Sequence, residues 1–97
     1  MDEQEYVVNN EEEQIQIELE TKALVKHIIS ELVSERKRQG ITQQEVADIT
    51  GMKAPNVTRI ESRKYTPTLE VLIRYAKAVG KELHIELVDE DRNNEMK

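Results

Sequence analysis

The stretch that most constrains the fold is residues 41–64, ITQQEVADITGMKAPNVTRIESRK, which has the pattern of two short helices joined by a glycine turn. Thr42 can cap the first helix, and Glu45 follows three residues later, as in a capping box. Gly51 can adopt the left-handed conformation that ends a helix and redirects the chain. Pro55 falls in the first turn of the second helix, where its missing N–H costs nothing. The sequence therefore predicts an angular pair of helices.

The second helix of this pair separates apolar from polar positions. Val57 and Ile60 fall on one side, whereas Asn56, Arg59 and Arg63 fall on the other. In a helix-turn-helix, the second helix presents its outer face to the major groove of DNA. We interpret residues 41–64 as a DNA-reading helix-turn-helix.

The net charge of −6 is unfavourable for nucleic-acid binding, but the charge is unevenly distributed. Residues 1–20 carry eight Asp and Glu and no Lys or Arg, so their charge is −8. The 14 Lys and Arg and the 12 Asp and Glu of residues 21–97 give +2. Because the local field steers a polyanion to a surface, the acidic N-terminal segment does not exclude DNA binding.

Two further helices are expected around the pair. In residues 21–39, Leu24, Ile28 and Leu32 form an apolar row at a spacing of four. Another helix is expected over residues 68–79, with Thr66 or Thr68 as its cap and Gly80 as its stop. Its inward residues are expected to be Leu69, Leu72, Ile73, Ala76 and Val79. Tyr75 lies off this stripe, where we expect it to be available to a second copy of the chain.

Residues 81–88 change period, because Leu83, Ile85 and Leu87 alternate with polar residues. This pattern predicts a short strand, and an unpaired strand edge is avoided in proteins. We expect antiparallel pairing with the same strand of a second copy, which would give a homodimer. The alternative partner is the segment 15–19 of the same chain, which also alternates.

The predicted fold is an all-α bundle of four to five helices with a short C-terminal β-strand for dimerisation. Residues 1–20 form an acidic segment that is partly disordered or partner-binding, residues 21–80 the DNA-binding domain, residues 81–88 the strand and residues 89–97 a flexible tail. The sequence contains no Cys and no apolar run long enough for a membrane span. We therefore expect a cytoplasmic protein without contact to a membrane.

Residues 41–80, ITQQEVADITGMKAPNVTRIESRKYTPTLEVLIRYAKAVG, resemble the Cro/C1-type helix-turn-helix family, also called XRE. The resemblance implies a lambda-repressor-like bundle that binds double-stranded DNA. The final helix followed by LHIEL at residues 83–87 looks most like HigA-type antitoxins of type II toxin–antitoxin modules. That likeness implies a repressor of its own operon that also neutralises a basic ribonuclease toxin.

The resemblance also implies which residues meet the DNA. Arg59 can donate two hydrogen bonds to guanine, Asn56 can bond an adenine, and the Ala54 methyl can pack on a thymine methyl. Gln43 would contact a phosphate or the edge of the site. Lys53 replaces the Ser or Thr that the family often has at this cap, and it adds a cation near phosphate. The candidate contacts, to bases or to the backbone, are Gln43, Lys53, Ala54, Pro55, Asn56, Thr58, Arg59, Ser62, Arg63, Lys64 and Tyr65.

Arg36 and Glu61 match positions that pair as a buried salt bridge in this family. The pair would tie the first helix to the DNA-reading helix. Removing one partner would leave a buried charge unpaired, at several kcal/mol.

The sequence gives no pattern typical of an enzyme, such as a nucleophile paired with a base or a phosphate-binding glycine loop. His27 and His84 have no ligand cluster around them, so neither a metal nor a cofactor is expected. The leading expectation is a dimeric repressor on an inverted-repeat operator, acting as an antitoxin. The alternatives are a stand-alone regulator with no toxin partner, and a bridging protein that uses the fold for protein binding only.

Overall fold

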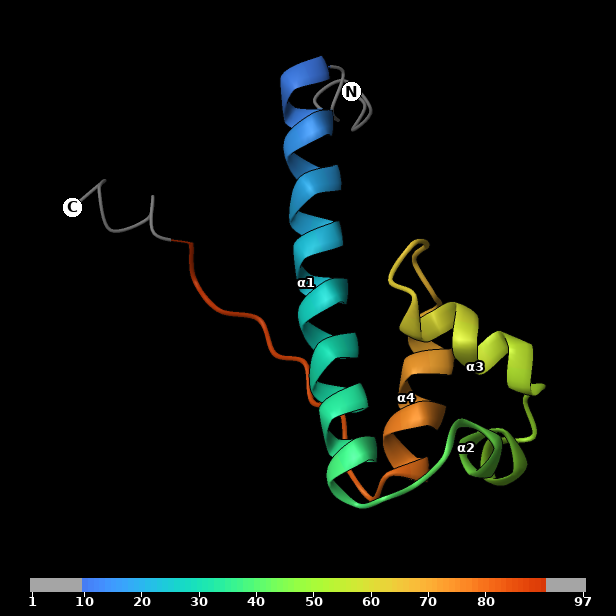
Figure 1. Ribbon diagram of the computed structural model, residues 1–97. Helices are drawn as coiled ribbons and strands as arrows, with labels where there is room; N and C mark the ends of the chain where they lie inside the picture. Colours follow the sequence, from blue (N-terminus) through green and yellow to red (C-terminus); the bar gives the residue numbers. More distant parts are fainter. Residues whose placement is uncertain (1–9, 91–97) are drawn as a thin grey trace.

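In the computed structural model, residues 10–90 are described, and they form four helices and no strand. The helices are α1 (Glu11–Arg38), α2 (Gln43–Thr50), α3 (Ala54–Glu61) and α4 (Leu69–Ala78). Figure 1 shows α2, α3 and α4 gathered beside the C-terminal half of α1, while its N-terminal half projects beyond them. The predicted all-helical bundle is confirmed. Residues 1–9 and 91–97, and the predictions made for them, lie outside the described part.

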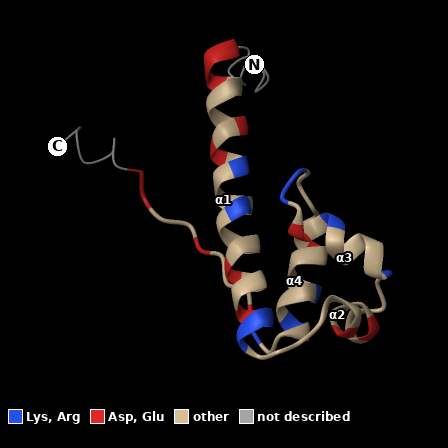
Figure 2. Cartoon of the chain, viewed as in Figure 1, with Lys and Arg blue, Asp and Glu red and all other residues tan. Residues whose placement is uncertain are grey.

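α1 begins ten residues earlier than the sequence predicted. The side chain of Asn10 caps the helix by accepting the N–H groups of Glu12 and Glu13, at 2.8 and 3.3 Å. Acidic residues fill the first turn and basic residues the last, an arrangement that complements the helix dipole (Figure 2). The strand considered for residues 15–19 is therefore wrong, because this segment is helical and cannot pair with residues 81–88.

Only the C-terminal half of α1 is covered by the rest of the bundle. Its 28 residues span about 42 Å, which is longer than the helices beside it. Ile29, Leu32 and Val33 are buried, whereas Leu24, expected on the buried stripe, is 57% exposed. Nearer the N-terminal end, the apolar side chains are exposed as well: Ile15, Ile17 and Leu19. Within residues 10–90, no other helix therefore covers the first half of α1.

α2 and α3 form the predicted helix-turn-helix. The Thr42 hydroxyl accepts the N–H of Glu45 at 3.0 Å, and the Glu45 carboxylate accepts the N–H of Thr42 at 2.8 Å. This reciprocal capping box starts α2, and Gly51 ends it with a φ of +79°. Lys53 stands at the N-cap of α3 without a side-chain hydrogen bond, and Pro55 lies in the first turn. α2 packs against α3 and α4, and α1 packs against the same two helices.

The core contains one aromatic residue, Tyr75, in an otherwise aliphatic cluster drawn from all four helices. The prediction that Tyr75 lies outside is wrong, because its side chain is 0% exposed. Leu72, Tyr75, Ala76 and Val79 follow the spacing of one helical face, and all are buried. Leu69, expected to point inward, is exposed. Ile49, an apolar residue of α2, is exposed as well.

Residues 81–90 follow α4 without regular secondary structure, so the strand predicted for residues 81–88 is not formed in the single chain. Leu83 packs against the core, whereas Ile85 is 63% and Leu87 is 98% exposed. A strand exists only through hydrogen bonds to another strand, and residues 10–90 offer none. None of the four helices is apolar enough over a sufficient length to cross a bilayer.

Candidate nucleic-acid interface

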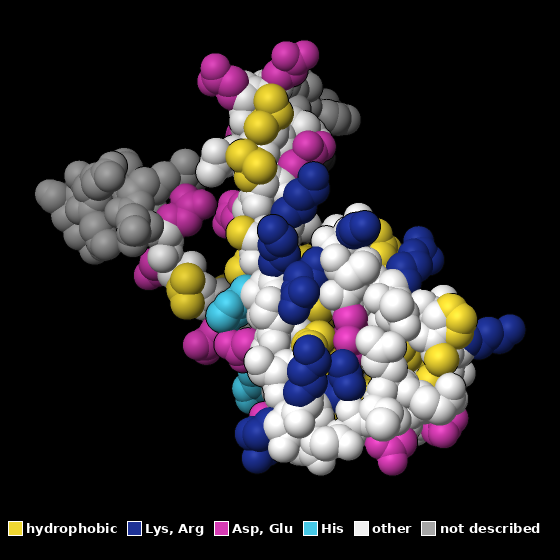
Figure 3. All heavy atoms as spheres, in the orientation of Figure 1, with side chains coloured by type: hydrophobic (Ala, Val, Ile, Leu, Met, Phe, Trp, Pro, Cys, Tyr) yellow, Lys and Arg dark blue, Asp and Glu magenta, His cyan; other side chains and the backbone are white. Residues whose placement is uncertain are grey.

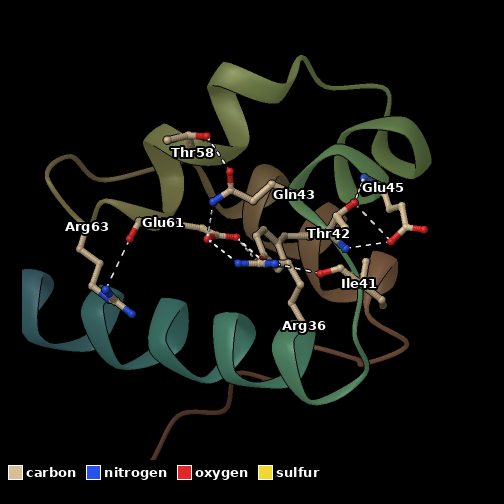
Figure 4. A network of polar contacts seen from close by, with 9 residues as sticks. Arg36, Ile41, Thr42, Gln43, Glu45, Thr58, Glu61 and Arg63 are labelled. Atoms are coloured by element: carbon tan, nitrogen blue, oxygen red, sulfur yellow. Dashed lines mark hydrogen bonds and ion pairs between the residues drawn. The ribbon is translucent and has the colours of Figure 1, made fainter.

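A polar network beneath the helix-turn-helix centres on Glu61, the last residue of α3 (Figure 4). Arg36 of α1 donates its Nε and Nη2 hydrogens to the two carboxylate oxygens of Glu61, at 2.8 and 3.0 Å. Gln43 of α2 donates from Nε2 at 2.9 Å, and the Tyr75 hydroxyl of α4 donates at 2.5 Å. One carboxylate therefore connects α3 to each of the other three helices.

Burial disfavours the charged forms of the side chains in this network, and the hydrogen bonds between them compensate for that cost. The side chains of Arg36 and Glu61 are each only 10% exposed. Burial opposes the charge of Glu61, but hydrogen bonds from Tyr75, Arg36 and Gln43 outweigh it and hold the pKa of Glu61 below its usual range. Burial and the bond to Glu61 raise the pKa of Tyr75, so its hydroxyl remains a donor. Arg36 also donates from Nη1 to the Ile41 carbonyl at 2.9 Å.

The two faces of α3 have opposite characters. Val57 and Ile60 are fully buried against the core. Asn56 and Arg59 lie on the opposite face and are exposed. The inward face fixes the helix, and the outward face leaves an amide and a guanidinium available to a partner. These are side chains that can bond the edges of bases in a major groove.

Arg59 is held in place by an aromatic ring. Its guanidinium carbon lies 4.1 Å from the centroid of the Tyr65 ring, in the segment after α3. A cation–π contact at an exposed site contributes about 0.5–1 kcal/mol. A guanidinium can pack its flat face on an aromatic ring and still donate hydrogen bonds from the N–H groups around its edge.

Some predicted contact residues are engaged within the protein. The Thr58 hydroxyl donates to Oε1 of Gln43 at 2.9 Å, and Gln43 is half-buried (Figure 4). Ala54 is half-buried and packs against the core, which limits the reach of its methyl group. The Ser62 hydroxyl donates to the Arg59 carbonyl at 2.6 Å. The predicted contact residues that are exposed are Lys53, Pro55, Asn56, Thr58, Arg59, Ser62, Arg63 and Lys64.

Arg63 points toward α1 rather than straight away from α3. Its φ of +61° is in the left-handed region, which is uncommon for a residue other than glycine. Its Nε donates to the Ser30 hydroxyl on α1 at 3.2 Å, and its Nη1 donates to the Glu61 carbonyl at 3.4 Å. Lys64 follows as an exposed cation.

Sequence reasoning missed two members of the network under α3. Tyr75 is buried rather than exposed, and its spacing from Leu72, Ala76 and Val79 is a usable signal for that face. Gln43 was expected only as a DNA contact, but in the structure it bridges Glu61 and Thr58. No local pattern indicates that bridge, because its partners come from a different helix.

Comparisons with known proteins agree with this geometry. A family model described as helix-turn-helix matches residues 32–85. The chain is similar to an uncharacterized HTH-type transcriptional regulator of Haemophilus influenzae, with 36% identity over 58 residues that cover 60% of this chain and 59% of that protein. It is also similar to an uncharacterized HTH-type transcriptional regulator of Methanothermobacter thermautotrophicus, with 39% identity over 59 residues that cover 58% of this chain and 84% of that protein. No solved structure matches.

Proposed function

The chain belongs to the helix-turn-helix family, and on that premise we propose that it is a sequence-specific DNA-binding repressor of transcription that works as a homodimer in the cytoplasm. The observation that carries the proposal is the exposed pair Asn56 and Arg59 on a helix whose opposite face is fully buried. The two relatives are named as transcriptional regulators, which supports control of transcription as the result of binding.

In the proposed complex, α3 enters the major groove. Arg59 bonds the O6 and N7 atoms of a guanine, and Asn56 bonds an adenine. Lys53 and Lys64 contact phosphates, which positions the domain without reading sequence. Gln43 keeps one amide hydrogen beyond the one given to Glu61, and this hydrogen can meet a phosphate near α2. Two copies bind half-sites about 34 Å apart on an inverted repeat.

Substitutions at Arg59 and Lys64 test this division of roles. Selection of bound sequences from random DNA first supplies the operator, and titrations then compare it with a scrambled duplex. We expect Arg59→Ala to weaken operator binding by about 1–3 kcal/mol and to relax preference at one base pair. Lys64→Ala should weaken both duplexes alike, because a phosphate contact carries no sequence information. Equal losses on both duplexes for Arg59→Ala would overturn the assignment.

A second role is favoured by the projecting half of α1. Its first turn carries Glu11, Glu12 and Glu13, and exposed Ile15 and Leu19 follow. An acidic helix with exposed apolar side chains suits a basic protein surface. We propose that the chain is the antitoxin of a type II toxin–antitoxin module, which binds a basic ribonuclease toxin through this segment and represses its own operon through α3.

Deletion of residues 1–20 separates the two roles. Residues 10–20 contribute no side chain to the core, so we expect the shortened chain to fold and to bind the operator. Capture of the basic partner from the native host, measured beside the full chain, should be lost. Capture that survives the deletion would place the interface elsewhere, and a host without such a partner would leave a stand-alone regulator.

DNA affinity that does not change with salt would favour a bridging protein.

A further inference from the structure

A hollow of about 220 Å³ lies between α1 and the segment that joins α3 to α4. Four cations line it: Lys22 and Lys26 from α1, and Arg63 and Lys64 from the joining segment. Tyr65 contributes to the same lining. We propose that this hollow binds a phosphate of the DNA held by α3, so that Lys22 and Lys26 extend the interface onto α1. The inference rests on the proposed DNA binding.

Local geometry explains why these cations converge. Lys22, Lys26 and Ser30 stand four residues apart, so they form one row along α1. Arg63 donates to the Ser30 hydroxyl, and this bond holds its guanidinium beside that row. The left-handed conformation of Arg63 turns the chain after α3 toward α1. Figure 3 shows Lys and Arg side chains following α1 and meeting those of the bundle on the same face.

The four cations of the hollow would be neutralised by an anion that binds from outside. Among residues 10–90, none of the four lining cations forms an ion pair, and no Asp or Glu lines the hollow. Like charges brought together repel, so a bound anion relieves a cost already built into the free protein. A phosphodiester supplies a negative charge and acceptor oxygens for the ammonium groups.

The position of the hollow identifies DNA as the source of the phosphate. Arg63 and Lys64 follow α3 directly, so a groove occupied by α3 brings its flanking phosphates to this side of the domain. Tyr65 connects the two places, because its ring contacts Arg59 and the residue also lines the hollow. The base-reading face and the hollow therefore form one continuous surface.

The salt dependence of binding tests the inference with Lys22→Gln/Lys26→Gln. A phosphate that the variant no longer neutralises should lower the slope of log K against log salt by about 0.9, so we expect a decrease of up to about 0.9 for the one phosphate in the hollow. The decrease should be equal on operator and scrambled DNA. Lys77→Gln/Lys81→Gln is the matched control, because it removes the same charge from exposed positions outside the hollow, and it should leave the slope unchanged.

Other outcomes separate the inference from the function on which it rests. An unchanged slope in Lys22→Gln/Lys26→Gln, together with relaxed specificity in Arg59→Ala, overturns the inference and keeps the proposed function. Failure of the wild type to bind any duplex overturns both. If the hollow holds the acidic first turn of a second copy, the double variant reduces self-association in sedimentation without changing the slope, which also overturns the inference.

Discussion

At the scale of single residues, Glu61 connects the core to the helix that carries the proposed DNA contacts. Its carboxylate accepts hydrogen bonds from Arg36, Gln43 and Tyr75, and its own helix carries Asn56 and Arg59. Loss of one partner from a buried ion pair leaves the other charge uncompensated, at about 3–5 kcal/mol. The most informative substitutions are therefore those that remove one donor and keep the shape of the side chain.

Tyr75→Phe removes the hydroxyl hydrogen bond to Glu61 and retains the buried ring. We expect the free energy of unfolding to fall by about 1.5–3 kcal/mol, the range for a hydrogen bond to a charged group. Urea denaturation followed by circular dichroism measures it. Tyr65→Phe is the control, because it keeps the ring beneath Arg59 and leaves Glu61 untouched. Similar losses in both variants would contradict a specific role for the Tyr75 hydroxyl.

The low pKa of Glu61 predicts loss of stability in acid. A carboxyl whose pKa is lower in the folded chain than its usual 4.5 stabilises the fold above that value, and the stabilisation disappears as pH falls through the folded pKa. From about pH 5 downward, the free energy of unfolding should therefore decline less steeply in Glu61→Gln than in the wild type. Urea titrations at a series of pH values measure both slopes.

Glu35 contributes over the same range and must be separated from Glu61. Hydrogen bonds from Arg38 and Gln39 lower the pKa of Glu35 to about 2. The free energy of unfolding of Glu35→Gln, measured over the same pH series as that of Glu61→Gln, shows how much of the acid dependence each carboxylate contributes. A Glu61→Gln chain with the full wild-type slope would show that Glu61 does not titrate as the network implies.

At the scale of elements, the capping box of α2 determines how the helix-turn-helix begins. Thr42→Ala removes the acceptor for the Glu45 N–H, and we expect a loss of about 0.5–2 kcal/mol in urea denaturation. Thr21→Ala is the matched control within α1, where the hydroxyl bonds the Ile17 carbonyl of its own helix. Ala is the better helix former there, so stability should hold or rise slightly. Equal losses at both positions would argue against the cap.

The elements that could be predicted from the sequence depend on local interactions. Thr42 and Glu45 form their capping box within one turn, and Gly51 ends α2 through its own backbone conformation. Thr68, one of the two residues expected as the cap of α4, accepts the N–H of Val71 at 3.2 Å. The opposite faces of α3 also follow from its sequence spacing. Such signals need no knowledge of the rest of the chain.

The elements that were missed depend on context. Alternation at residues 15–19 suggested a strand, but the Asn10 cap and the charges at both ends of α1 favour a continuous helix. Residues 81–88 have a strand pattern, and a strand cannot form without a partner. In the candidate interface, the engagement of Gln43 with Glu61 and Thr58 depends on tertiary packing. Sequence spacing does not contain that information.

At the scale of the whole molecule, exposed apolar residues after α4 predict self-association. Ile85 and Leu87 alternate along residues 81–88 and are largely exposed in the single chain. We expect Ile85→Lys/Leu87→Lys to be monomeric in sedimentation, because charged side chains would oppose pairing of this segment with its copy. Affinity for the full inverted repeat should fall, whereas affinity for one half-site should remain.

A comparison substitution locates the interface. Leu69→Lys alters another exposed apolar residue, at the start of α4. It should leave self-association unchanged if the segment 81–88 makes the dimer. Dissociation by Leu69→Lys, with none caused by Ile85→Lys/Leu87→Lys, would move the interface to α4.

The connection of Glu61 to every other helix has a consequence for how new specificities arise. The side chains that hold α3 in the bundle and those that face outward occupy different positions, so one set can vary while the other is kept. If α3 reads DNA as proposed, gene duplication followed by a few substitutions at Pro55, Asn56 and Arg59 would change the sequence that is bound without a new scaffold. A library randomised at these three positions should consequently retain mostly folded members.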